Sequence, residues 1–172
     1  MKKTILLLSL LVATCGIISQ SCKKTEDTPK VEEFVADNNS FKDYSSWPLQ
    51  RTYNGPDPLL GATAHANNDS TVVRKVYFKN GQERVNGKFP VGTIVVKHST
   101  NPAGTVNEVT AMVKRGNNFD ASNNDWEYFM LKPDGTLLMD PNGMVMRGAK
   151  LMGGMCAGCH GVVSAKDYIY SK

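Results

Sequence analysis

The sequence has few cysteines and histidines, and it lacks a long apolar run. Among its 172 residues are four cysteines and three histidines. Four cysteines are too few for the disulfide framework that stabilises many small secreted domains. The main apolar run, residues 5–18, is shorter than the about 20 residues that a membrane-spanning helix needs. The chain is instead long enough to fold around one hydrophobic core.

Residues 1–21 have the pattern of an export signal. Two lysines precede the apolar run, which gives way to polar residues at its end. Cys22 follows directly and predicts a lipoprotein-type cleavage site with a lipid on this cysteine. The alternative is an ordinary signal peptidase site that uses Ser19 and Ser21 as its small residues and releases a soluble protein. Both predict a domain outside the cytoplasm, and the lipid predicts a periplasmic or outer-membrane lipoprotein in the cell envelope.

The rest of the chain divides into a tether and one domain. Residues 22–40 are charged and polar with little periodicity, which is typical of a flexible tether. Residues 41–172 form the predicted domain. Loss of the signal's two lysines lowers the formal charge from +4 to +2. Charge therefore gives no argument for a nucleic-acid partner, and we expect none.

Within the domain, the apolar period changes from helical to strand-like. Residues 41–47 have helical spacing, with Ser40 as a possible N-cap and Pro48 closing the segment, and predict a short helix. Residues 141–154 predict a loop that leads into a C-terminal helix. These elements and the short turns favour an α+β fold with a mainly antiparallel sheet and a few short helices. The predicted strands are rich in β-branched and aromatic residues and span 71–78, 93–98, 106–114 and 126–131.

The predicted C-terminal helix carries the motif C-A-G-C-H. Cys156 and Cys159 lie one helical turn apart, as thiols that form thioethers with haem vinyl groups do, and His160 follows as the proximal iron ligand. Cys15 leaves with the signal and Cys22 takes the lipid, so no cysteine is left over. The sequence therefore predicts one covalently bound haem c per chain.

Two other uses of the motif fit less well. A structural zinc site needs a second pair of ligands, and the remaining histidines, His65 and His98, are far apart in the chain. A thioredoxin-like redox pair follows a strand in a βαβ unit, which this strand-rich order does not contain. Both histidines are better interpreted as surface or hydrogen-bonded side chains. Five methionines near the motif suit packing against the haem, although a thioether on the iron would make a simple electron carrier instead: Met139, Met144, Met146, Met152 and Met155.

Four segments in this order resemble the cytochrome P-460 family. They are F-P-V-G-T-I-V-V-K at 89–97, M-V-K-R at 112–115, D-W-E-Y-F at 125–129, and the cysteine motif through D-Y-I-Y, residues 156–170. The resemblance covers roughly residues 41–172. It implies a mainly antiparallel β fold, usually dimeric, whose haem has histidine on one face and an open position on the other. Members of this family oxidise hydroxylamine and handle nitric oxide, whereas close relatives bind nitric oxide or carbon monoxide without that chemistry.

The resemblance also implies two catalytic residues. Lys97 corresponds to a lysine whose amine is bonded to the haem edge, although by itself it fits a surface lysine at the end of a strand. Arg74 corresponds to an arginine on the open side of the haem, or else forms an ion pair at the sheet surface. We expect an oxidoreductase that acts on hydroxylamine or nitric oxide and passes electrons to an external electron-transfer protein. The alternative is a non-catalytic gas-binding or electron-transfer cytochrome.

Overall fold

The structure is a computed structural model that describes residues 32–56 and 69–172. All of these belong to the second of two compact units, Val31–Lys172. The expected signal, Cys22 and His65 lie outside the described residues. No helix in the described ranges combines the length and the apolar character that crossing a bilayer requires.

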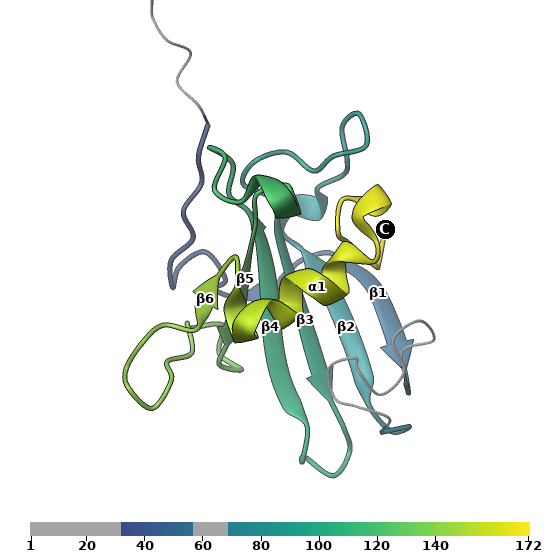
Figure 1. Cartoon of the computed structure of the whole chain (residues 1–172). Coiled ribbons are helices and arrows are strands. Elements are labelled where there is room, and N and C mark those ends of the chain that lie inside the picture. The colour runs from purple at the N-terminus through teal and green to yellow at the C-terminus, as the bar shows by residue number, and fades with distance from the viewer. Residues whose placement is uncertain (1–31, 57–68) are drawn as a thin grey trace, which may run out of the picture. The chain divides into compact units, whose positions relative to one another are not determined.

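A six-stranded antiparallel sheet dominates the domain, and each strand pairs with the next one in the chain (Figure 1). This confirms the predicted α+β fold. Strands β2 to β5 match the four predicted strands closely, because alternating apolar residues mark them in the sequence. The strands are β1 (Leu49–Asn54), β2 (Val73–Phe78), β3 (Ile94–Thr100), β4 (Asn107–Lys114), β5 (Trp126–Leu131) and β6 (Arg147–Gly148).

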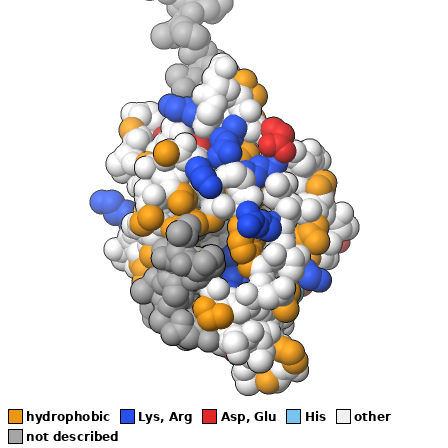
Figure 2. Space-filling model, turned by 90° about the vertical axis from the view of Figure 1, so that its right-hand side faces the viewer, with side chains coloured by type: hydrophobic (Ala, Val, Ile, Leu, Met, Phe, Trp, Pro, Cys, Tyr) orange, Lys and Arg blue, Asp and Glu red, His pale blue; other side chains and the backbone are white. Residues whose placement is uncertain are grey.

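The edge strand β1 was not predicted. Five of its six residues are exposed, and its register on β2 is irregular between Leu49 and Arg51. A strand without a buried face shows no alternation of apolar and polar residues. Figure 2 looks at this side of the domain, where Lys and Arg predominate among the charged side chains. Charged side chains on an edge disfavour pairing with a further strand.

The predicted helix at residues 41–47 is wrong in extent. The segment contains only the 3-10 turn η1 (Tyr44–Ser46), which begins after Asp43 rather than after Ser40. A segment this short has little helical stability of its own. Its conformation is set by the packing of Phe41, which is fully buried, and of Tyr44. The other helical elements are η2 (Lys79–Gly81), η3 (Ala121–Asn123), η4 (Leu151–Gly154), α1 (Met155–Gly161) and η5 (Ser164–Lys166).

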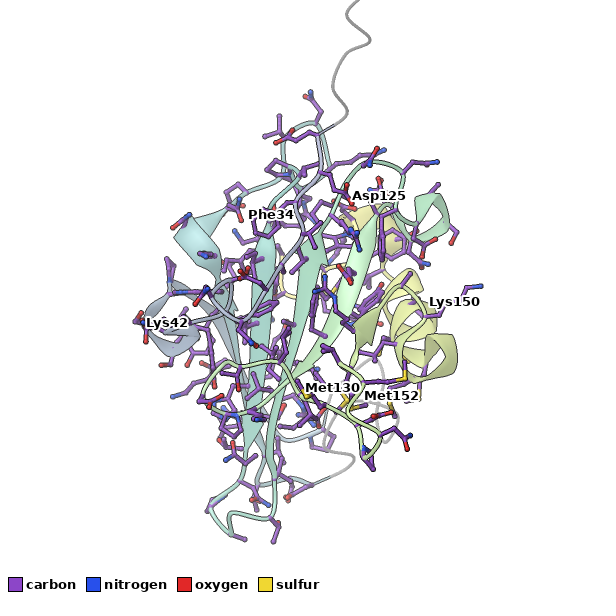
Figure 3. The ribbon with its side chains drawn as sticks, turned by 90° about the vertical axis from the view of Figure 1, so that its left-hand side faces the viewer. Phe34, Lys42, Asp125, Met130, Lys150 and Met152 are labelled. Carbon is purple, nitrogen blue, oxygen red and sulfur yellow. The ribbon has the colours of Figure 1, made fainter. Side chains whose placement is uncertain are left out.

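The sheet separates two apolar clusters. We call the side covered by α1 the helix face (Figure 1) and the other side the opposite face. The N-terminal segment covers the opposite face, where Phe34 packs against the core (Figure 3). Side chains that alternate along β3 belong to different clusters: Ile94 and Val96 face the N-terminal segment, and Val95 faces α1.

Residues 32–40, which the sequence assigned to the tether, are packed onto the sheet. The Phe34 amide donates to the Arg115 carbonyl oxygen at 2.8 Å. Ala36 is 1% exposed and belongs to the core of the opposite face. The packed structure therefore begins nearer residue 32 than the expected domain boundary at residue 41. The predicted loop at residues 141–154 also contains the two-residue strand β6 and the η4 turn.

Candidate functional site

Helix α1 presents the cysteine motif to the helix face of the sheet. Ala157 is buried in the cluster on that face, and Cys156 packs against the same cluster. Cys156 and Cys159 are free thiols of intermediate exposure. Residues three apart lie on the same side of a helix. The two thiols therefore meet the geometric requirement for attaching one planar group.

His160 is held in the tautomer that binds metals. Its Nδ1 lies 2.8 Å from the carbonyl oxygen of Tyr168. A carbonyl only accepts hydrogen bonds, so Nδ1 carries the proton and Nε2 has the lone pair. The rings of Tyr128 and Tyr170 lie 5.6 Å and 5.5 Å from the imidazole ring. These neighbours orient the ring, and Nε2 is the nitrogen that the neutral imidazole offers to a metal.

The carboxylate of Asp167 anchors the segment that follows α1. It lies 3.0 Å and 3.2 Å from the Lys114 amine, and both side chains are buried. Burial lowers the pKa of Lys114, while the Asp167 carboxylate raises it. Sequence reasoning missed this role, because Asp167 entered it only as part of a family segment. The carboxylate also accepts hydrogen bonds from the Phe89 amide at 2.6 Å, Asn124 at 2.6 Å and the Trp126 indole at 3.2 Å.

Three rows of paired side chains cross the helix face below α1. Successive rows are two residues apart, or about 7 Å along the strands. The first row packs against α1 and consists of Phe78, Val95, Met112 and Tyr128. The Lys97 row consists of Val76, Lys97, Thr110 and Met130. The Arg74 row consists of Tyr53, Arg74, Ser99 and Glu108.

Both predicted catalytic residues thus lie on the side of the sheet that carries α1. Arg74 is 3% exposed, and its guanidinium donates a hydrogen bond to the Gly55 carbonyl oxygen. It is therefore not a surface residue. Lys97 is half-buried in the next row. Polar side chains from β2, β3 and β4 therefore lie beside the apolar row under the helix.

The Cys156 thiol responds to charges in these rows. Burial has the largest effect and raises its pKa, the positive charge of Lys97 lowers it, and the negative charge of Glu108 raises it. Glu108 was missed in the sequence. The alternation of residues 106–114 puts it on the same face as Met112, but which residues lie across from it depends on the register with β3.

A buried hydroxyl group without a partner lies on a residue beside His160. Among the described residues, Ser99, Tyr128 and Ser171 each have a buried hydroxyl oxygen without a hydrogen-bond partner. Burial raises the pKa of Tyr128, so its hydroxyl keeps its proton and can donate a hydrogen bond. Its ring lies beside His160. An unsatisfied donor next to the metal-binding imidazole is consistent with a polar group of a bound cofactor.

The other histidine and methionine predictions differ in outcome. His98 lies on the opposite face, where Nδ1 is 3.1 Å from the Tyr44 hydroxyl and Nε2 is 2.8 Å from Asn107. This confirms a hydrogen-bonded histidine. In the described ranges, no three His, Cys, Asp or Glu side chains form a group that could hold a metal ion. Of the five methionines near the motif, Met146 is half-buried and the other four are exposed, and their packing against the haem stays a prediction: Met139, Met144, Met152 and Met155.

Met130 is a methionine that sequence reasoning did not single out. It belongs to the Lys97 row, and its amide donates to the Met146 carbonyl oxygen at 3.0 Å. Figure 3 labels Met130 in the lower half of the view, with Met152 to its right. Its thioether is therefore on the same face as Lys97.

The sheet, the helix-borne cysteine and histidine motif and the buried hydroxyls together are those of a cytochrome, a haem protein. Residues 41–171 match the sequence model of the Cytochrome P460 family. The chain belongs to the cytochrome P460 family, and its cofactor is haem. The residues present fit this group, because His160 is held in the coordinating tautomer. Comparisons with curated proteins and with solved structures found no match.

The unsatisfied Tyr128 hydroxyl generates a testable prediction. In the haem-loaded protein, Tyr128→Phe should lower the free energy of unfolding by about 1 kcal/mol, because it removes a donor to the cofactor. In haem-free protein the same change should be neutral or stabilising. Tyr44→Phe is the matched control, because its hydroxyl has protein partners at His98 and Pro133, both at 3.1 Å. Denaturant unfolding of both variants, with and without haem, checks this, and a loss for Tyr128→Phe in haem-free protein would contradict it.

Proposed function

We propose that this protein is an exported c-type cytochrome that oxidises hydroxylamine or acts on nitric oxide at a five-coordinate haem. The observation that carries the proposal is the polar region of Arg74, Lys97 and Glu108 beside the helix with His160. A simple electron carrier has a second axial ligand, such as methionine, on the iron. Three ionisable side chains on one sheet face instead suit binding and deprotonation of a small ligand.

The cysteines would hold the haem covalently. Each thiol of Cys156 and Cys159 adds across one vinyl group, so that sulfur bonds to one vinyl carbon and the proton goes to the other. One motif holds one haem per chain. His160 would hold the iron through Nε2, while its Nδ1 donates a hydrogen bond to the Tyr168 carbonyl oxygen. When bound, the haem supplies an iron that takes a nitrogen ligand and passes electrons to an acceptor.

The chain's own groups have separable roles toward the substrate. Arg74 presents a fixed, always charged donor from a buried position, which suits an oxygen or nitrogen acceptor. Glu108 is the carboxylate in the same row as Arg74, because both residues pair with Ser99. A carboxylate accepts the protons that hydroxylamine loses as it is oxidised. We therefore assign Arg74 to substrate orientation and Glu108 to proton removal.

Lys97 is the residue proposed to bond to the haem edge. It lies on the helix face one row beyond Val95, which belongs to the cluster that Cys156 packs against. Joining an amine nitrogen to a ring carbon removes one hydrogen from each, and this two-electron oxidation requires an oxidant such as peroxide. The bond would add electron density to the ring and distort it, two means of changing the chemistry of the iron.

Peptide mapping tests both types of covalent bond. A tryptic digest of the holoprotein should yield haem bound to a peptide with Cys156 and Cys159, joined to the peptide that contains Lys97. Lys97→Leu should release the second peptide and restore an ordinary c-type spectrum. Lys75→Leu is the matched control, because Lys75 is an exposed lysine that pairs with His98. Haem that separates from the chain on denaturation would refute covalent attachment, and an unmodified Lys97 peptide would refute the cross-link.

Steady-state kinetics test the catalytic roles. Glu108→Gln should slow hydroxylamine oxidation about 100-fold, within the range of general-base contributions, while carbon monoxide still binds the ferrous protein. Glu108→Asp keeps the carboxylate and should retain part of the rate. The enzyme proposal fails if the unaltered protein binds carbon monoxide rapidly but does not oxidise hydroxylamine with any added electron acceptor.

The second candidate function is a non-catalytic gas-binding or electron-transfer cytochrome. One observation favours it: Met130 lies in the Lys97 row, so a thioether is present on the same face as the proposed substrate groups. A thioether on the iron would close the sixth position. Carbon monoxide binding to the ferrous protein would then be slow, and Met130→Ala would make it fast. Fast binding in the unaltered protein argues for an open position.

The location and partners complete the proposal. We infer a lipid on Cys22 that attaches the protein to a membrane of the cell envelope, an external electron-transfer protein as acceptor, and a homodimer as the assembled form. A single acyl chain binds a membrane only weakly and needs a second anchoring signal. The lipid of a lipoprotein has several acyl chains and needs no second signal. Intact mass of membrane-extracted protein tests the lipid: a mature chain that starts at unmodified Cys22 would favour plain secretion.

A further inference from the structure

We propose that Asp167 is a positioning residue that sets the strength of the bond between His160 and the haem iron. The inference rests on the proposed role of His160 as axial ligand. Asp167 does not touch the imidazole. It acts through Tyr168, the next residue, whose carbonyl oxygen lies 2.8 Å from His160 Nδ1.

The carboxylate is held more tightly than an anchor of the chain alone requires. Asp167 is 2% exposed, and donors from four residues converge on its two oxygens. They come from the segment before β3, from the end of β4, from the turn before β5, and from β5 itself. The contacts are those of Phe89, Lys114, Asn124 and Trp126.

The backbone at this point adopts a conformation that needs such support. Asp167 has φ 50° and Tyr168 has φ 64°, two successive residues in the left-handed region. Residues with side chains adopt this region at a cost, and they stay there only where the surrounding contacts hold them. Tyr168 is held a second time by its hydroxyl, which donates to the Ser122 carbonyl oxygen at 3.0 Å. The direction of the Tyr168 carbonyl group thus depends on the contacts of Asp167.

That direction affects the iron through the imidazole. A strong hydrogen bond from Nδ1 to a carbonyl oxygen makes Nε2 more basic. A more basic axial ligand binds iron more strongly and favours the ferric state, which lowers the midpoint potential. Loosening Asp167 should therefore weaken the hydrogen bond, lower the iron–histidine stretching frequency and raise the midpoint potential.

A purely structural role would leave these two signals unchanged, and the chain provides a control. Glu127 is also 2% exposed and also pairs with a cation, Arg147 at 2.7 Å and 2.8 Å, although the Arg147 side chain is more exposed than that of Lys114. It is adjacent to Trp126 on β5 but points to the opposite face. Its loss removes a buried carboxylate from an ion pair on the other face of the sheet.

The experiment compares the haem-loaded forms of Asp167→Asn, Asn124→Gly and Glu127→Gln. Asn124 has φ 51°, so glycine keeps its backbone conformation and removes only the donor at 2.6 Å. Resonance Raman spectra of the ferrous protein give the iron–histidine frequency, redox titration gives the potential, and thermal unfolding gives the stability. We expect a lower frequency and a higher potential in Asp167→Asn, a smaller change of the same sign in Asn124→Gly, and lost stability alone in Glu127→Gln.

The outcomes separate this inference from the proposed function. An unchanged frequency and potential in Asp167→Asn, or in Asn124→Gly if the first variant does not fold, overturn the role of Asp167. The same shifts in Glu127→Gln also overturn it, because they would follow from general destabilisation. His160→Ala should abolish the iron–histidine band. If the band survives, His160 is not the ligand, and the proposed haem ligation and this inference fall together.

Discussion

The buried ion pair between Asp167 and Lys114 is the constraint on which the site depends. It joins the segment after α1 to the end of β4, 53 residues earlier in the chain. Breaking a buried pair by removing one partner leaves an uncompensated charge and costs about 3–5 kcal/mol. Here the cost would destabilise the segment after α1, which contains no strand among its described residues and is not held by pairing with the sheet. The segment is also held by Ile169 in the cluster on the helix face, by the Tyr168 hydroxyl on the Ser122 carbonyl oxygen and by the Lys172 amine on the Gln82 carbonyl oxygen.

The two faces of the sheet divide stability from chemistry. On the opposite face, large aromatic and aliphatic side chains form a continuous cluster, and Glu127 there is paired with Arg147. On the helix face, the apolar cluster extends beyond the row under α1 to Val76 and Tyr53, and the polar side chains of Arg74, Lys97 and Glu108 lie in the same two rows. Polar groups on a sheet face are costly when they are buried without partners. A bound haem has polar groups at its edge that would offset this cost. The buried hydroxyls of Ser99 and Tyr128, which lack partners, are consistent with this interpretation.

Local sequence patterns predicted much of the fold and only part of the site. Strands β2 to β5 and the motif helix were predictable, because alternation and a five-residue motif are local signals. The edge strand β1 was missed for lack of a buried face, and residues 41–47 were assigned too much helix because tertiary packing decides so short a segment. Glu108 and Asp167 were missed for another reason. Their neighbours come from other strands, and only the register between strands brings them together.

The order of strands has a consequence for how the molecule is assembled. Every strand pairs with the one before it in the chain, so all ladder contacts form between neighbouring segments, which keeps the entropic cost of loop closure low. The contact from Phe89 to Asp167 instead spans 78 residues, and the whole cysteine motif follows the last strand. The sheet can thus form before the C-terminal segment docks. The C-terminal segment then docks onto a sheet that has already formed. This last segment to dock carries the cofactor-binding residues.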